Sequence, residues 1–174
     1  SKFIEWVATK RSEVTASRCL AQLSVYMRRA VDLEYIDSNP CVGIKKYPEP
    51  ESRTRIFSDE EYVNCVKAVI RNISHQHSKI IYLLLLIPLR FQEVTSMQWS
   101  RIDLDKGTYF IPADLAKNRR ARTIALSPPA IDLLTQMYSE RDVENDWVFP
   151  AKSESGHTVN IGVQFKKILD EAGI

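Results

Sequence analysis

The sequence lacks the features that mark secreted and membrane-spanning proteins. Only three of its 174 residues are cysteines, and none forms a Cys-x-x-Cys pair, so we expect reduced thiols rather than a disulfide scaffold. The longest apolar run, Ile80–Leu89, has ten residues and is too short to span the roughly 30 Å of bilayer hydrocarbon. Acidic and aromatic residues interrupt the opening SKFIEWVATK, which therefore resembles no signal peptide. These absences predict a cytoplasmic protein without a membrane partner.

Glycines and metal-ligating clusters are also scarce. The five glycines form no glycine-rich phosphate loop. His75 and His77 make a His-x-His pair, but no Cys, Asp or Glu stands beside them at ligand spacing. His157 is interpreted as a loop histidine that precedes a helix cap. We therefore expect no metal and no other cofactor.

The sequence has no large excess of charge of one sign, because it contains 24 Lys and Arg and 22 Asp and Glu, a net charge of +2. The distribution is uneven, however. Residues 1–55 hold ten basic and seven acidic residues, a net charge of +3, whereas residues 56–174 have a net charge of −1. Between the two parts, residues 47–55 are rich in proline and charge, which is typical of an exposed linker. We predict a helical domain over 1–46, a linker over 47–55 and a second domain over 56–174.

The hydrophobic pattern predicts a mainly α fold with a small antiparallel β-sheet (α+β). In the first part, apolar residues at helical spacing indicate helices over 3–7 and 15–34, and Asn39-Pro40 is expected to end the helical segment. In the second part, Ser58 and Glu61 form a capping box that begins a helix reaching about Asn72. The run 80–89 is apolar all round, which predicts a helix buried on every side that Pro88 kinks or ends.

After Trp99 the hydrophobic pattern changes from one typical of helices to one typical of strands. Residues 108–111 and 122–126 are predicted to form two strands, with residues 118–121 near the turn of their hairpin. Pro128 begins a helix to about Glu140, residues 147–149 are extended, and Asn160 caps a last helix that ends near Gly173.

Arg90 directly follows the most apolar stretch of the chain. Taken alone, it is better explained as a helix-end arginine that reaches solvent. Glu93 stands three residues further on, a spacing at which its carboxylate can orient the guanidinium. An oriented guanidinium suits bidentate binding of a phosphate.

The surrounding residues resemble the first catalytic-arginine box of the tyrosine recombinases, the phage integrase family. In LIPLRFQEVTSMQWSRID, the matching positions are Leu89, Arg90, Glu93, Trp99, Ile102 and Asp103. Met97 replaces the usual leucine and Pro88 the customary glycine. Such a multi-point match is specific, whereas an Arg-x-x-Glu pair alone would carry no information.

A second block, AKNRRARTIALS, is similar to the β-hairpin of the same family. Alone, its basic residues would be better explained as a solvated hairpin tip. The resemblance implies that Lys117 is the catalytic lysine and that Arg119 and Arg120 contact the DNA backbone.

The first segment is similar, more weakly, to the core-binding domain of this family, which closes around duplex DNA together with the catalytic domain. The resemblance makes six basic residues candidates for phosphate contacts: Arg11, Arg18, Lys45, Lys46, Arg53 and Arg55.

The resemblance implies site-specific recombination of double-stranded DNA through a 3′-phosphotyrosyl intermediate. Arg90 would stabilise the charge on the phosphate, Lys117 would protonate the 5′-oxygen, and Glu93 would orient Arg90. The resemblance also implies that the protein partners are other recombinase protomers, which form a tetramer on DNA. It further implies a bacterial or phage-encoded origin.

The family's His-x-x-Arg motif and tyrosine nucleophile are expected beyond Ile174, and the start also resembles a truncated core-binding domain. The chain by itself is then predicted to contain no nucleophile and to bind DNA without cutting it. The alternative is a truncated or degenerate DNA-binding protein without catalytic activity.

Overall fold

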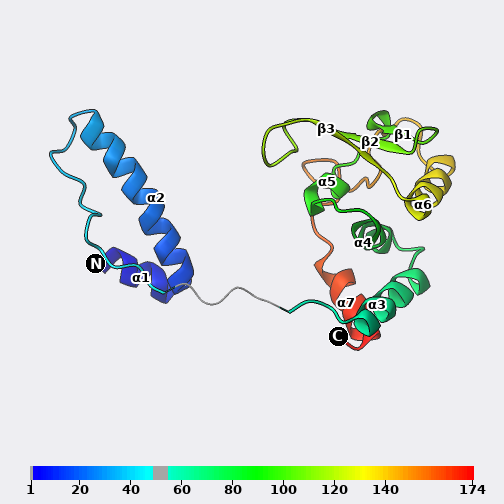
Figure 1. Ribbon diagram of the computed structural model, residues 1–174, viewed down its shortest axis with the longest axis horizontal. Helices are drawn as coiled ribbons and strands as arrows, with labels where there is room; N and C mark the ends of the chain where they lie inside the picture. Colours follow the sequence, from blue (N-terminus) through cyan, green and yellow to red (C-terminus); the bar gives the residue numbers. More distant parts are fainter. Residues whose placement is uncertain (1, 49–54) are drawn as a thin grey trace. The chain divides into compact units, whose positions relative to one another are not determined.

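Two helices form the first of two units into which the structure divides, residues 1–55 and residues 56–174 (Figure 1). The structure is a computed structural model that describes residues 2–48 and 55–174. Helix α1 spans Lys2–Lys10 and α2 spans Glu13–Asp32, where Ser12 accepts a hydrogen bond from the Thr15 amide as the N-cap. Apolar side chains from both helices and Cys41 form a small core, so the helical prediction for this segment is confirmed.

Helix α2 ends at Asp32 for a reason that the sequence pattern did not indicate. Glu34 has a left-handed φ of 59°, its amide donates to the Val31 carbonyl, and the Tyr35 amide donates to the Ala30 carbonyl. This is a Schellman motif, which completes the hydrogen bonds of the last turn. The helix predicted over 15–34 therefore ends within two residues of its expected end, and Asn39-Pro40 lies in the loop beyond it. Asn39 ties this loop to α2, because its Nδ2 donates to the Ser24 carbonyl at 3.0 Å.

The expected linker begins with a residue that is attached to the first unit. The Tyr47 amide donates to Ser17 Oγ at 3.0 Å, and this serine is buried on α2. The chain is therefore held against the helices as far as Tyr47. Residues 49–54, the middle of the expected linker, lie outside the described residues.

Helix α4, Gln76–Leu86, lies at the centre of the second unit and packs against four other helices. These are α3 (Asp59–Arg71), α5 (Phe91–Thr95), α6 (Pro128–Ser139) and α7 (Gly162–Ala172). The predicted capping box is confirmed, since Ser58 Oγ accepts from the Glu61 amide and Glu61 Oε2 from the Ser58 amide. The expected start of α6 at Pro128 is also confirmed. Ile161 is the residue before α7, and Asn160 Oδ1 accepts from the Gly162 amide at 2.7 Å.

A three-stranded antiparallel sheet lies on the side of α4 away from α3 and α7 (Figure 1). Strands β1 (Ile102–Asp103), β2 (Thr108–Ile111) and β3 (Arg122–Ala125) follow in sequence order, with Ile111 opposite Arg122 in the register. The hairpin was predicted, but β1 was missed because two residues carry no alternating pattern. The mainly α architecture with a small antiparallel sheet is confirmed. Within the described residues, no helix is long and apolar enough to cross a membrane.

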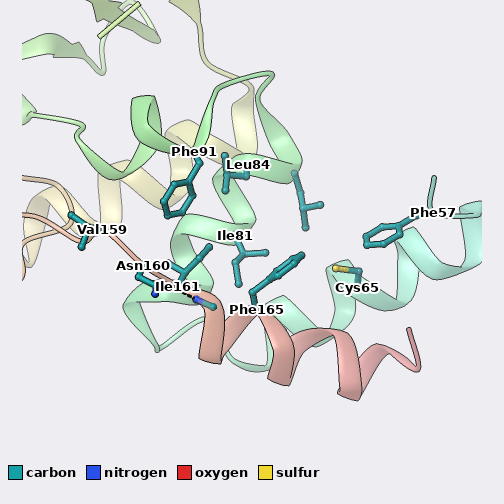
Figure 2. A pocket seen from close by; sticks show the side chains of 11 residues that line it. Phe57, Cys65, Ile81, Leu84, Phe91, Val159, Asn160, Ile161 and Phe165 are labelled. Atoms are coloured by element: carbon teal, nitrogen blue, oxygen red, sulfur yellow. Dashed lines mark hydrogen bonds between the residues drawn. The ribbon is translucent and has the colours of Figure 1, made fainter. Parts of the chain in front are cut away.

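The expectation that residues 80–89 form a helix buried on every side is wrong. The helix ends at Leu86, two residues before Pro88, and Leu84 and Leu85 remain partly exposed. Both line an open apolar pocket together with Phe57, Phe91 and Phe165 (Figure 2). The core of the unit covers Ile80 and Leu83 on the other face of α4. An apolar run shows only that its residues are hydrophobic. Which faces of the helix are covered depends on the neighbouring elements that pack against it.

Candidate functional site

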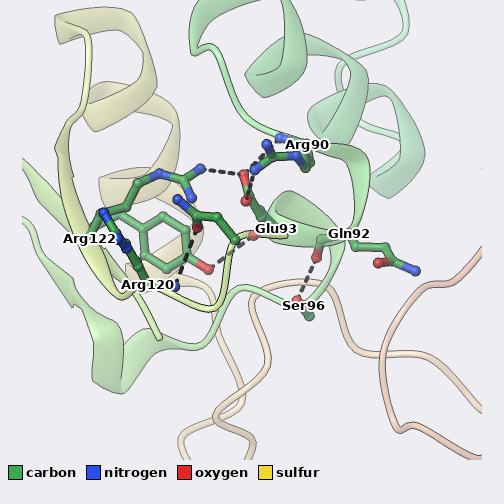
Figure 3. A network of polar contacts seen from close by, with 8 residues as sticks. Arg90, Gln92, Glu93, Ser96, Arg120 and Arg122 are labelled. Carbon is green, nitrogen blue, oxygen red and sulfur yellow. Dashed lines mark hydrogen bonds and ion pairs between the residues drawn. The ribbon is translucent and has the colours of Figure 1, made fainter. Parts of the chain in front are cut away.

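A buried carboxylate, Glu93, lies at the centre of the candidate site, where it joins two arginines that are far apart in the sequence (Figure 3). Its Oε1 accepts from Arg90 Nη1 at 2.9 Å. Its Oε2 accepts from the Arg90 backbone amide at 2.9 Å and from Arg122 Nη2 at 2.8 Å. The Glu93 side chain is fully buried, whereas those of Arg90 and Arg122 are 53% and 33% exposed. One carboxylate thus holds two guanidinium groups that reach the surface.

Local sequence and tertiary packing together place Glu93. Pro88 lies between α4 and α5, and Arg90 is the N-cap of α5, with an extended backbone directly before the first helical residue. Glu93 lies one turn into this short helix, from which its carboxylate returns to the Arg90 amide. Behind it, the buried Tyr109 hydroxyl on β2 donates to the Glu93 backbone carbonyl at 3.0 Å. The hairpin therefore fixes the helix that carries the carboxylate.

The electrostatics keep Glu93 ionised. Burial alone would raise the pKa of its carboxyl group, but hydrogen bonds from the Arg90 amide, Arg122 and the Arg90 side chain hold the pKa below its usual value. Tyr109 is affected in the opposite sense, since burial raises the pKa of its hydroxyl to about 12. The site therefore contains one stable anion and two cations.

A pocket opens beside the two arginines, with a volume of about 420 Å³. Its lining residues are Pro88, Leu89, Arg90, Asn118 and Arg122. Two cations and an amide line this pocket without an acidic residue, so it suits an anion. An oxyanion such as a phosphate can accept several charge-assisted hydrogen bonds from such a pair.

Lys117, Arg119 and Arg120 lie together in the loop that joins β2 to β3, and all three side chains are exposed. Arg119 has a left-handed φ of 52°, and its amide donates to the Ala116 carbonyl at 2.8 Å. Lys117 directly precedes Asn118, a residue of the pocket. The hairpin thus carries these basic residues to the same end of the sheet as Arg122.

Five of the six expected phosphate contacts of the first unit are described by the structure, and all five are surface residues. Arg11 follows α1, Arg18 lies on α2, and Lys45 and Lys46 lie in the segment after the helices, all with exposed side chains. Arg55 is also exposed. Arg53 lies outside the described residues.

The histidines have local partners. His75 is the N-cap of α4, where its Nδ1 accepts from the His77 amide at 3.2 Å. His157 stacks at a tilt on Trp147, with ring centroids 4.7 Å apart. Across residues 2–48 and 55–174, no three His, Cys, Asp or Glu residues form a group that could hold a metal ion.

Sequence reasoning missed Arg122 as part of the site. It lies 29 residues from Glu93, and only the pairing of β3 with β2 brings it there. The sequence did contain one indirect signal. A glutamate within an apolar box needs several donors when it is buried, and the basic hairpin was the segment able to supply them.

Comparison with known proteins finds a family model and several relatives that are similar to this chain. The sequence model of the phage integrase family matches residues 55–174. A Haemophilus influenzae protein named as an integrase/recombinase is 27% identical over 159 residues, which cover 84% of this chain and 43% of that protein. A protein of Escherichia coli K12 named as defective, IntQ, is 31% identical over 134 residues, which cover 71% of this chain and 33% of that protein.

The fold is also similar to solved structures. One is a lambda integrase tetramer bound to a Holliday junction, with a TM-score of 0.68 and 15% identity over 98% of this chain and 51% of that one. The chain spans less than half the length of the two curated relatives.

Proposed function

The chain belongs to the phage integrase family, and we propose that it is part of a longer tyrosine recombinase that carries out site-specific recombination of double-stranded DNA. The observation that carries the proposal is the Arg90–Glu93 pair, an arginine held by a buried carboxylate at an open, cationic pocket. This is the arrangement that a DNA phosphate requires, because the guanidinium is aligned before the substrate arrives.

Within this proposal, Arg90 binds non-bridging oxygens of the scissile phosphate and stabilises the negative charge that grows in the transition state. Glu93 orients Arg90 and touches no substrate. Lys117 protonates the 5′-oxygen as it leaves, acting as a general acid. The nucleophile is a tyrosine, and the resulting 3′-phosphotyrosyl bond retains the energy of the phosphodiester, so that rejoining needs no nucleotide.

The two units have separate tasks in this proposal. Residues 1–46 form part of a core-binding domain, 47–55 a linker, and 56–174 the first part of the catalytic domain. The excess of positive charge in residues 1–55 supports a DNA contact there through Arg11, Arg18, Lys45, Lys46, Arg53 and Arg55. Arg119 and Arg120 contact the DNA backbone from the hairpin.

Other protomers of the same recombinase are the proposed protein partners. Support comes from the lambda integrase structure, a tetramer on a Holliday junction, which has a similar fold. The proposed place of action is the bacterial cytoplasm, where the DNA substrate lies.

We also propose that this chain by itself binds DNA without cutting it. Tyr109 is the tyrosine that contacts Glu93, but its hydroxyl is buried and donates to a backbone carbonyl. Its pKa of about 12 further disfavours the phenolate. Tyr109 therefore supports the structure of the site and is unsuited to attack a phosphate.

A second candidate function is DNA binding by a protein that has lost catalysis. The observation in its favour is the similarity to IntQ, which is named as defective. Sequencing the gene beyond the Ile174 codon distinguishes the two. An open reading frame with a His-x-x-Arg motif and a tyrosine supports the enzyme, and a stop codon supports the defective protein.

The proposal is tested by measuring the affinity of the 174-residue chain for duplex DNA in increasing salt. Each neutralised phosphate should add about 0.9 to the slope of log K against log salt concentration. An SDS gel should show no covalent protein–DNA product. An affinity that does not change between about 50 and 200 mM salt would contradict phosphate binding by the two units.

A further inference from the structure

The Arg122 side chain, like that of Arg90, donates a hydrogen bond to the Glu93 carboxylate, although sequence reasoning did not identify Arg122. It is the first residue of β3, opposite Ile111 in the hairpin register. Its Nη2 donates to Glu93 Oε2 at 2.8 Å, and one third of its side chain is exposed. Figure 3 shows Arg90 and Arg122 approaching the carboxylate from separate elements.

The hydrogen-bonding capacity of the pair exceeds what Glu93 uses. A guanidinium has five N–H donors, and the contact with Glu93 takes one from each arginine side chain. Both arginines also line the same pocket, together with Asn118. The pocket therefore has two fixed guanidinium forks that can bind an additional acceptor.

The charge balance points to an anion. One carboxylate faces two guanidinium groups, so the cluster has a net charge of +1, and its single anion is withdrawn into the protein interior. If Arg122 served only to neutralise a buried carboxylate, Arg90 alone would complete that task. The second cation leaves an excess of charge at the surface, where a phosphate can bind bidentately to each fork.

We propose that Arg122 is a second phosphate-binding arginine of this site, which holds one DNA phosphodiester together with Arg90 while Glu93 fixes both side chains. This inference rests on the proposed function for the identity of the ligand as DNA. Arg122 is separate from the arginine of the expected His-x-x-Arg motif and lies within the described fold.

The first test compares two variants of the 174-residue chain that lose the same charge. Arg122→Gln removes the proposed contact, and Lys152→Gln removes an exposed charge on a loop. At moderate salt, Arg122→Gln should lower duplex affinity about tenfold or more, as expected for a charged hydrogen bond. It should also reduce the salt slope by about 0.9, the contribution of one phosphate. Equal effects of the two substitutions on affinity and slope would overturn the inference.

The second test measures phosphate binding on the wild-type chain. Inorganic phosphate is titrated into the wild-type chain at constant ionic strength, and the Nε–H resonances of Arg90 and Arg122 are followed by NMR. The resonances are assigned with Arg122→Lys and Arg90→Lys. Both should shift along one binding curve, whereas chloride should move neither. A shift of Arg90 alone, or of neither arginine, would overturn the shared phosphate site.

The two tests separate this inference from the proposed function. If the chain binds DNA and Arg122→Gln behaves like Lys152→Gln, the inference fails while the function stands. If the chain fails to bind DNA but both resonances respond to phosphate, the anion pocket stands and the proposed function fails.

Discussion

A buried carboxylate such as that of Glu93 is stable as an anion only when donors and cations replace its water. Both oxygens are occupied, one by Arg90 and the other by the Arg90 amide and Arg122. The same contacts hold the arginines in one orientation at the surface. At the scale of single residues, stability and function therefore depend on the same hydrogen bonds.

This dependence predicts how stability varies with pH. The pKa of Glu93 is lowered in the folded chain, so its stabilising effect is present above the unfolded value of about 4.3 and is lost as pH falls through the folded value. Glu93→Gln should lower the free energy of unfolding by about 1–3 kcal/mol at pH 7, because the arginines lose a charged acceptor. Urea unfolding at pH 7 and at about pH 3 measures this loss, which should be smaller at the lower pH.

Glu154→Gln is the control for this prediction, since Glu154 is an exposed loop residue. It should change the unfolding free energy little at either pH. A deficit of Glu93→Gln that stays constant across the two pH values would show that the charge of Glu93 does not stabilise the fold.

Lys117 has a separate prediction, because its role depends on a proton and not on a fixed contact. In the longer recombinase, Lys117→Ala should be slow on ordinary DNA, since a 5′-alkoxide leaves poorly without protonation. A substrate with sulfur at the bridging 5′ position should restore cleavage substantially, because thiols have a pKa of about 8.5 and the thiolate leaves without protonation. Single-turnover cleavage of both substrates measures the restoration.

Arg90→Ala is the comparison. Arg90 is proposed to bind charge on the other phosphate oxygens, so the sulfur substrate should not restore cleavage by Arg90→Ala to the same extent. If Lys117→Ala is equally slow on both substrates, Lys117 positions DNA, and Arg119 or Arg120 becomes the candidate acid.

At the scale of elements, the site depends on a helix too short to be stable alone. Helix α5 has five residues, and isolated helices of that length do not persist in water. Its buried residues Glu93, Val94 and Thr95, and the Tyr109 hydroxyl bonded to its backbone, hold it in place. The β1–β2–β3 sheet is therefore part of the site, although it contributes one side chain, Arg122, to the pocket.

Gly107 allows a prediction for this sheet. It lies in the turn between β1 and β2 with a left-handed φ of 60°, and an added Cβ would stand 2.7 Å from Ile131 Cδ1 on α6. Gly107→Ala should therefore lower the unfolding free energy by more than about 1 kcal/mol, through backbone strain and this contact. Chemical denaturation measures the loss.

Gly173→Ala is the matched control, because Gly173 has a φ of 76° and open space around its Cα. It should show the backbone strain alone, and so a smaller loss than Gly107→Ala. Equal losses would mean that Ile131 moves aside and that α6 does not restrict the turn.

At the scale of the whole molecule, the segment that matches the family model is the one that contains the candidate site. The family match begins at residue 55, one residue before the second unit starts, and contains Arg90, Glu93 and Lys117. The first unit lies outside this match and holds the excess of positive charge. This division is consistent with our proposal that one unit supplies chemistry and the other supplies additional contacts to DNA.

Features that depend on neighbouring residues could be predicted from the amino-acid sequence. The Ser58–Glu61 capping box, the end of α4 before Pro88 and the start of α6 at Pro128 were predictable because each follows from local backbone chemistry. The contact between Arg90 and Glu93 belongs to the same group, since three residues separate them.

Features that join distant segments depend on the three-dimensional packing of the chain. Arg122 meets Glu93 across 29 residues and Tyr109 meets it across 16, and both contacts depend on how the hairpin docks against α5. The open face of α4 depends likewise on which helices cover it. Local sequence patterns do not predict contacts between residues so far apart in the sequence, because these contacts depend on how whole helices and strands pack.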